Sequence, residues 1–214
     1  MKLPYSQNVS AKEAPGIRSP IILASQSPQR KILLEQVGFF VSCFPVDIDE
    51  TPLCDELPGD LVVRLALTKV KRCAADLQKT ANVGERIPAR VIIGADTTID
   101  LDNTSLGKPL GESDAMGMLN RLAEREHLVH TGICALNRTT EKSETLLVTT
   151  IVRFGCISTE QAKRYWDSGE PMGKAGAYGI QGLGAQFVAH LSGSYSNVVG
   201  LPLYETLQLV EEVS

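Results

Sequence analysis

The sequence predicts an α/β protein in which a mixed, twisted sheet is flanked by helices. Short apolar blocks typical of buried strands alternate with segments whose apolar residues recur at helical spacing. Two neighbouring apolar segments, residues 128–136 and 146–154, are expected to pair with each other as strands. The chain has 214 residues, 43% of them hydrophobic, which is enough for one well-buried core.

The chain opens with a predicted strand, a polar turn and a helix. Residues 20–24 form an apolar block of the kind that fills a strand buried on both faces. Ser27 is a favourable N-cap, Pro28 suits the first helical position, and Gly38 can end the helix. A second strand is expected over residues 39–44.

The remaining elements continue the alternation. An acidic loop over residues 47–58, interrupted by prolines, leads into a helix over residues 59–77, and a strand over residues 91–93 ends next to Asp96. Further along we expect a strand continuation at 98–101, a helix at 112–122, strands at 128–136 and 146–154, a helix at 158–166, a glycine-rich loop at 169–184, a strand at 187–191 and a closing helix at 202–213.

Composition excludes several classes of partner. A net charge of −4 lacks the basic footprint that long nucleic acid requires. No stretch has the apolar length of a membrane span. The five cysteines are odd in number and contain no CxxC pair, which favours a reducing cytoplasm over a disulfide framework. We therefore expect a cytoplasmic protein that binds neither long nucleic acid nor a membrane.

One domain is predicted after a short extension. Residues 1–19 are polar throughout and have no apolar segment of the signal-peptide type, so we interpret them as a loosely ordered N-terminal extension. Residues 20–214 contain all the predicted strands and helices and form a single domain.

The turn between the first strand and the first helix is a candidate anion site. Ser25 and Ser27 supply hydroxyls, and Arg30 and Lys31 supply cations, around a helix N-terminus. Unpaired backbone N–H groups and the helix dipole favour negative charge at this location. An ordinary N-cap with a solvated basic turn explains the same residues, and composition alone leaves that alternative open.

A second candidate site combines carboxylates and lysines. Asp96 follows a buried strand, where open α/β sheets place their ligands. Glu50 belongs to the acidic loop, and hard divalent cations take oxygen ligands from one or two such carboxylates plus substrate phosphates. Lys69 and Lys108 can each neutralise a phosphate, although each one taken singly is also typical of a surface lysine.

The glycine-rich loop has small residues that allow a ligand to approach the backbone, and Gln181 can recognise a polar edge. The spacings of a Walker loop, a GxGxxG turn, an HExxH helix and a GxSxG elbow are all absent from the sequence.

The order of these motifs resembles the Maf nucleotide pyrophosphatases over about residues 20–210. The matching blocks are LASQSPQRKILL, DIDET, GADTTI, GKPL, KAGAYGIQGLG and VVGLPLYET. The resemblance implies a fold like that of the inosine triphosphatase group, with a cleft between two lobes. It also implies hydrolysis of nucleoside triphosphates between the α and β phosphates, a divalent metal (Mg, Mn or Co) and a homodimer.

The resemblance further implies roles for individual residues. Asp96 is expected to accept the proton of the attacking water, with Glu50 and Asp96 close to the metal. Lys69, Lys108 and Arg30 match the phosphate-contacting cations, and Ser25 and Ser27 match the hydroxyls at the helix terminus.

Three positions, Gln29, Thr97 and Gln181, correspond to those that separate a dTTP/UTP branch of the family from a 7-methyl-GTP branch. Thr97 and Gln181 match the pyrimidine branch, and an amide can pair with the N3–H and a carbonyl of uracil or thymine. Gln29 departs from that branch, which has arginine there. The expected substrates are dTTP and UTP, with CTP and modified pyrimidine nucleotides as extensions; 7-methyl-GTP hydrolysis and a non-catalytic regulator of cell division are the alternatives.

Overall fold

A computed structural model describes residues 18–81 and 89–214 of the chain. Its strands are β1 (Ile21–Leu23), β2 (Val41–Cys43), β3 (Val91–Leu101), β4 (Thr104–Leu106), β5 (Glu126–Asn137), β6 (Ser143–Phe154) and β7 (Val188–Ser192). Its helices are α1 (Pro28–Gln36), α2 (Pro58–Ala81), α3 (Glu112–Leu122), α4 (Thr159–Asp167), α5 (Tyr195–Val199) and α6 (Leu203–Val213), with two short 3₁₀ turns, η1 (Ala175–Ala177) and η2 (Leu183–Phe187).

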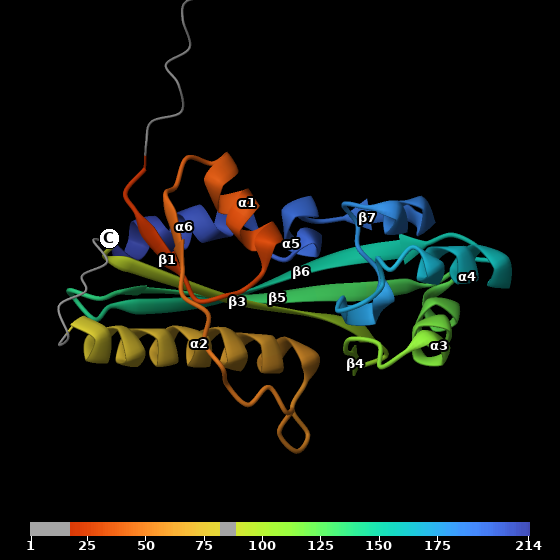
Figure 1. Ribbon diagram of the computed structural model, residues 1–214, viewed down its shortest axis with the longest axis horizontal. Coiled ribbons are helices and arrows are strands. Elements are labelled where there is room, and N and C mark those ends of the chain that lie inside the picture. The colour runs from red at the N-terminus through yellow and green to blue at the C-terminus, as the bar shows by residue number, and fades with distance from the viewer. Residues whose placement is uncertain (1–17, 82–88) are drawn as a thin grey trace, which may run out of the picture.

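The strands form one mixed sheet of seven strands in the order β2-β1-β3-β5-β6-β7, with β4 paired to β3. Strands β2, β1 and β3 run parallel, whereas β3, β5, β6 and β7 are antiparallel neighbours. Helices flank this sheet (Figure 1), so the predicted mixed sheet with flanking helices is confirmed. The cleft between two lobes stays a prediction.

Strand β3 has different partners along its length, and this difference creates the site described below. Its first residues pair with β1 up to Ile93, and its last residues pair with β4 from Ile99 onward. Between these points, no described strand pairs with that side of β3, while β5 continues along the other side. The segment from residue 94 to 98 therefore has an open edge in the middle of the sheet.

Helix α2 covers one face of the sheet, and α1, α5 and α6 lie on the other (Figure 1). Glycines allow α2 to approach closely. A Cβ atom on Gly94 would lie 2.7 Å from the carbonyl oxygen of Ala66, and one on Gly132 would lie 2.3 Å from that of Val62. Both distances are impossible for a side chain, so the two glycines set the separation between α2 and the sheet. Apolar residues are buried between these two layers. Ile22 of β1, for example, lies in the same core cluster as Ala66 and Val70 of α2.

The structure corrects several boundaries. Asp96 lies inside β3, not just past a strand, because antiparallel pairing with β5 continues through it. The structure adds a helix at Tyr195–Val199 and a strand at Thr104–Leu106 that the sequence pattern did not predict. The predicted strand at residues 39–44 shortens to Val41–Cys43. Most of the predicted extension, residues 1–17, lies outside the described residues, whereas Arg18 donates from its backbone to Gly38 at 3.0 Å.

Within the described ranges, no helix combines the length and the apolar character that crossing a membrane requires.

Candidate active site

The side chains of Glu50, Lys69 and Asp96 meet at the open edge of β3. The Lys69 ammonium lies 2.5 Å from Oδ1 of Asp96 and 2.6 Å from Oε1 of Glu50. These residues come from the acidic loop, α2 and β3, so three separate segments contribute to one cluster. Lys69 is only 8% exposed, and such burial of an ammonium group is tolerated because two carboxylates bond to it.

The close packing of α2 against β3 explains why Lys69 reaches Asp96. Both residues lie in the interface between α2 and the sheet, and the close approach at Gly94, two residues before Asp96, brings the helix against β3. A bulkier residue at position 94 would push α2 outward and lengthen the bond between Lys69 and Asp96.

Glu50 is ionised more readily than an ordinary glutamate. Partial burial raises the pKa of its carboxyl group, but the hydrogen bond and charge of Lys69, together with the charges of Lys108 and Arg30, outweigh burial and hold this pKa below its usual range. The exposed Lys108 thus acts electrostatically on the cluster, as does Arg30.

Arg30 lies beside the cluster and is held by three hydrogen bonds. Its Nε donates to the carbonyl oxygen of Gly200 at 2.8 Å, Nη2 to Oγ1 of Thr97 at 3.0 Å, and Nη1 to Oγ of Ser25 at 3.4 Å. Burial lowers the pKa of the guanidinium while Asp96 and Glu50 raise it, and an arginine stays charged at neutral pH. A fixed cation therefore lies close enough to interact electrostatically with the two carboxylates.

The N-terminus of α1 has the predicted cap. Ser27 accepts a hydrogen bond from the backbone N–H of Arg30 at 3.4 Å, and Pro28 occupies the first turn. Ser25, 9% exposed, accepts from the backbone N–H of Ser27 at 3.1 Å. The turn is thus ordered by its own hydroxyls, with the positive end of the helix dipole beside Arg30.

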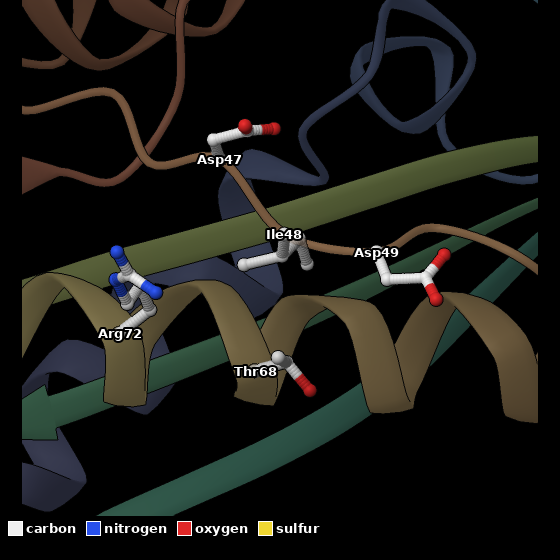
Figure 2. A pocket seen from close by; sticks show the side chains of 5 residues that line it. All are labelled: Asp47, Ile48, Asp49, Thr68 and Arg72. Carbon is white, nitrogen blue, oxygen red and sulfur yellow. The ribbon is translucent and has the colours of Figure 1, made fainter.

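Two other acids of the loop, Asp47 and Asp49, line a different region. An open hollow of about 560 Å³ is lined by Asp47, Ile48, Asp49, Thr68 and Arg72 (Figure 2). Asp49 accepts from the backbone N–H of Thr51 at 2.9 Å, and Arg72 is paired with Asp76 at 2.6 Å. In the described part of the chain, Glu50 is the acid of this loop that contacts Lys69.

The structure does not join every predicted residue to the cluster. Gln29 is exposed on the first turn of α1, where Oγ of Ser27 approaches its side-chain oxygen at 3.4 Å. Gln181 is exposed in the loop between η1 and η2, and the hydrogen bonds among described residues do not connect it to Asp96. Thr97 contacts Arg30 directly.

Sequence reasoning missed three residues around Arg30: Thr131 on β5, Asn197 in α5 and Gly200 after α5. Gly200 supplies the carbonyl that accepts from Arg30, and Asn197 is 0% exposed. The available signal was Ser194, which caps α5 by accepting from the N–H of Asn197 at 3.2 Å, followed by Gly200 at the end of that helix.

Fold and charge pattern together define a class of protein: an α/β protein whose charged side chains gather where a parallel strand ends. The chain belongs to the Maf family, because residues 20–213 match the family model described as Maf-like protein.

Curated relatives of the chain extend over nearly its whole length. A dTTP/UTP pyrophosphatase of Pseudoalteromonas translucida is 46% identical over 191 residues, covering 89% of this chain and 95% of the relative. A dTTP/UTP pyrophosphatase of Pseudoalteromonas atlantica is 44% identical, covering 91% and 97%. Among solved structures, the Ham1 protein of Staphylococcus aureus aligns with 64% of this chain and 72% of its own, at 12% identity and a TM-score of 0.42.

Proposed function

We propose that this protein hydrolyses nucleoside triphosphates, with dTTP and UTP preferred, to the nucleoside monophosphate and pyrophosphate. The observation that carries the proposal is the contact of one buried ammonium group, Lys69, with two carboxylates, Asp96 and Glu50, beside the fixed guanidinium of Arg30. The names of the curated relatives support the same reaction.

The cations bind and orient the polyphosphate. Arg30 keeps N–H groups beyond its three hydrogen bonds, and Lys108 is exposed and acts electrostatically on Glu50, so both are able to contact phosphate oxygens. The N-terminus of α1 adds a partial positive charge. Fixed donors of this kind stabilise the negative charge that builds up on the departing pyrophosphate.

Asp96 acts as the proton acceptor. One of its oxygens, Oδ1, is bonded to Lys69, which restrains the carboxylate at the open edge of β3. Water adds to the α-phosphorus, the bond from that phosphorus to the bridging oxygen breaks, and the water proton passes to Asp96. A positioned carboxylate near the attacking water is the geometry that general base catalysis requires.

The donor set fits a hard divalent cation. Glu50 and Asp96 supply carboxylate oxygens on either side of Lys69, and Mg²⁺ is commonly bound by one or two carboxylates together with substrate phosphates and water. No set of three or more acidic, histidine or cysteine ligands occurs in the described ranges, so substrate oxygens would complete the site. Such an ion, Mg, Mn or Co, supplies charge neutralisation and polarises the phosphate.

Base selection is assigned to Gln181, whose amide offers a donor and an acceptor to a pyrimidine edge. The proposal includes a homodimer and a cytoplasmic location. Support for the location comes from the cysteines: Cys43, Cys54, Cys73, Cys134 and Cys156 are all free.

Pyrophosphate release from dTTP, UTP, CTP, 5-methyl-UTP and 7-methyl-GTP tests the proposal, with Mg or Mn and with a chelator control. Metal-dependent turnover led by dTTP or UTP is expected. Turnover led by 7-methyl-GTP would assign the chain to the other branch. Binding without turnover of any nucleotide would favour a regulatory nucleotide binder.

A further inference from the structure

Thr97 and Asp96 are adjacent in β3, but their side chains lie on opposite faces of the sheet. Asp96 bonds to Lys69 of α2 on one face. Thr97 contacts Arg30 of α1 and the carbonyl of Gly200, which follows α5, on the other face. This alternation is inherent in a strand. The two neighbours therefore serve different parts of the site.

The hydroxyl of Thr97 is already engaged. Its oxygen accepts from Nη2 of Arg30 at 3.0 Å, lies 2.9 Å from Oγ1 of Thr131, and lies 3.4 Å from the carbonyl oxygen of Gly200. A threonine hydroxyl has one proton to donate, and the shortest available acceptor is Thr131. In either direction of the contact with Thr131, the Thr97 proton already has an acceptor within the protein, Thr131 or the carbonyl of Gly200.

The hydrogen bonds continue from Thr97 into the interior. Thr131 donates to the backbone oxygen of Asn197 at 3.3 Å, so the order Arg30 to Thr97 to Thr131 to Asn197 assigns each hydroxyl proton an acceptor. Thr131 and Asn197 are both 0% exposed. Breaking one of these bonds would leave an unpaired polar group in a low dielectric, so the chain from Arg30 to the backbone oxygen of Asn197 resists rearrangement.

Asn197 also fixes the second acceptor of Arg30. Its side-chain amide donates to the backbone oxygen of Val129 and to Oγ1 of Thr150, both at 3.0 Å, which fastens α5 to β5 and β6. Gly200 ends this helix with φ of 122°, a conformation that favours glycine, and its carbonyl accepts from Nε of Arg30. Two of the three acceptors on the guanidinium, Thr97 and Gly200, therefore depend on the same buried network.

We propose that Thr97 is a positioning residue of the phosphate site. With Thr131, Asn197 and Gly200 it holds the guanidinium of Arg30 toward the polyphosphate, and it affects nucleotide use through the phosphates that all nucleotides share, without contacting the base. The inference rests on the proposed function only in taking the ligand to be a nucleoside triphosphate.

Calorimetric binding of inorganic triphosphate tests the inference, because this ligand has no base and no nucleoside. Thr97→Val removes the hydroxyl at nearly constant volume and is expected to weaken triphosphate binding by about tenfold, the scale of one hydrogen bond to a charged group. Thr97→Ser keeps the hydroxyl and should restore affinity.

Thr98→Val is the matched control. Thr98 is the next residue of β3, is 5% exposed, and bonds to Ser105, but it lies on the opposite face from Arg30. Triphosphate affinity should be unchanged in this variant. Thermal unfolding of each variant shows whether it is folded at the temperature of the binding experiment.

Two further measurements separate positioning from base contact. In the first measurement, Thr97→Val should lower affinity for dTTP, UTP and 7-methyl-GTP by the same factor. In the second, the effect of Thr97→Val should largely disappear when Arg30 is also replaced by Lys, because Thr97 acts through Arg30. A change in the ratio between bases with triphosphate binding intact would overturn the inference, as would additive effects of the two substitutions.

The inference and the proposed function can fail separately. If no nucleotide is hydrolysed but triphosphate binding still responds to Thr97→Val, the reaction is wrong and the positioning role is upheld. If the unsubstituted protein hydrolyses dTTP but Thr97→Val binds triphosphate as tightly as the unsubstituted protein does, the positioning role is wrong and the reaction stands. Absence of both triphosphate and dTTP binding would contradict both.

Discussion

The region around Asp96 and Arg30, which is the phosphate end of the proposed site, and the loop between α4 and β7 are built in different ways. At the phosphate end, charged side chains come from α1, α2 and β3 and bond to one another: Lys69 to Asp96 at 2.5 Å, and Arg30 to Thr97 at 3.0 Å. Regular elements packed against a sheet hold these groups, so their geometry follows from the core of the fold.

The loop that carries Gln181 depends mainly on one carboxylate. Glu170 accepts from the backbone N–H groups of Leu183 at 2.7 Å and Gly184 at 2.9 Å, and from the hydroxyl of Tyr165 at 2.8 Å. Partial burial raises the pKa of Glu170, but the N–H groups of Gly184 and Leu183 outweigh it and keep this pKa below its usual range. An irregular loop thus obtains order from an ionised side chain.

Under the proposed function, this difference predicts that chemistry and base selection are separable. Disturbing the cluster around Asp96 should affect turnover of every nucleotide, whereas loosening the loop should change which nucleotide is preferred. One backbone bond, from the N–H of Gly176 to the oxygen of Gly107 at 2.9 Å, connects the loop to the segment that bears Lys108.

The largest effect is expected from Asp96→Asn. The amide retains the shape of the carboxylate but cannot accept the water proton, so kcat should fall by about 100-fold or more for every substrate. Nucleotide binding, measured by calorimetry, should change little. Near-normal turnover in this variant would contradict the role of Asp96 and remove the distinction between the two regions.

The phosphate end was also the more predictable region. Asp96, Lys69 and Glu50 were chosen from the sequence because carboxylates and lysines next to strand ends and loops have known uses with phosphates. Their meeting point was not predictable from local pattern, because it depends on how closely α2 packs on Gly94 and on where the pairing of β1 with β3 stops.

The parts that sequence reasoning missed depend on tertiary contacts. Helix α5 has five residues, too few for an apolar period to be visible, and is stabilised through Asn197 by β5 and β6. Glu170 has no distinctive sequence context, since its three acceptor bonds reach residues 165, 183 and 184.

Glu170→Gln tests the role of the loop that carries Gln181. The amide of Gln presents an N–H group where one of the backbone N–H groups now finds an acceptor, so the loop should lose order around Gln181. The ratio of kcat/KM for dTTP over 7-methyl-GTP is expected to fall by roughly tenfold, the scale of one lost hydrogen bond to a charged group, with kcat for dTTP changed less.

Glu160→Gln, on the exposed first turn of α4, is the matched control and should leave this ratio unchanged. Tyr165→Phe removes a hydroxyl that bonds to both Glu170 and the N–H of Gly179, and should shift the ratio in the same direction. An equal loss of kcat for all nucleotides in Glu170→Gln would show that the loop serves chemistry as well.

Acid should destabilise the folded protein through protonation of His127, which contacts the loop that carries Gln181. Burial lowers the pKa of this histidine from 6.5 to about 4, and its Nε2 lies 2.8 Å from the hydroxyl of Tyr178 in the loop. The unfolded chain therefore binds more protons between these values, and the free energy of unfolding should fall by about 2 kcal/mol from pH 7 to pH 5.

Urea unfolding at the two pH values measures this change, and His127→Gln should reduce it, because glutamine does not titrate. A pH dependence of the same size in His127→Gln would assign the effect to other groups.

The smallest effect is expected from Gln29→Arg. Gln29 is exposed on the first turn of α1, one residue before Arg30, and no described hydrogen bond links it to Asp96. An added guanidinium near the phosphates should lower KM for dTTP and UTP by about twofold to fivefold, the scale of an exposed charge interaction, without changing kcat. Raising the salt concentration should remove the gain. If KM stays constant at low salt, position 29 lies outside the phosphate field, and the departure from the pyrimidine branch at this residue has no consequence for substrate affinity.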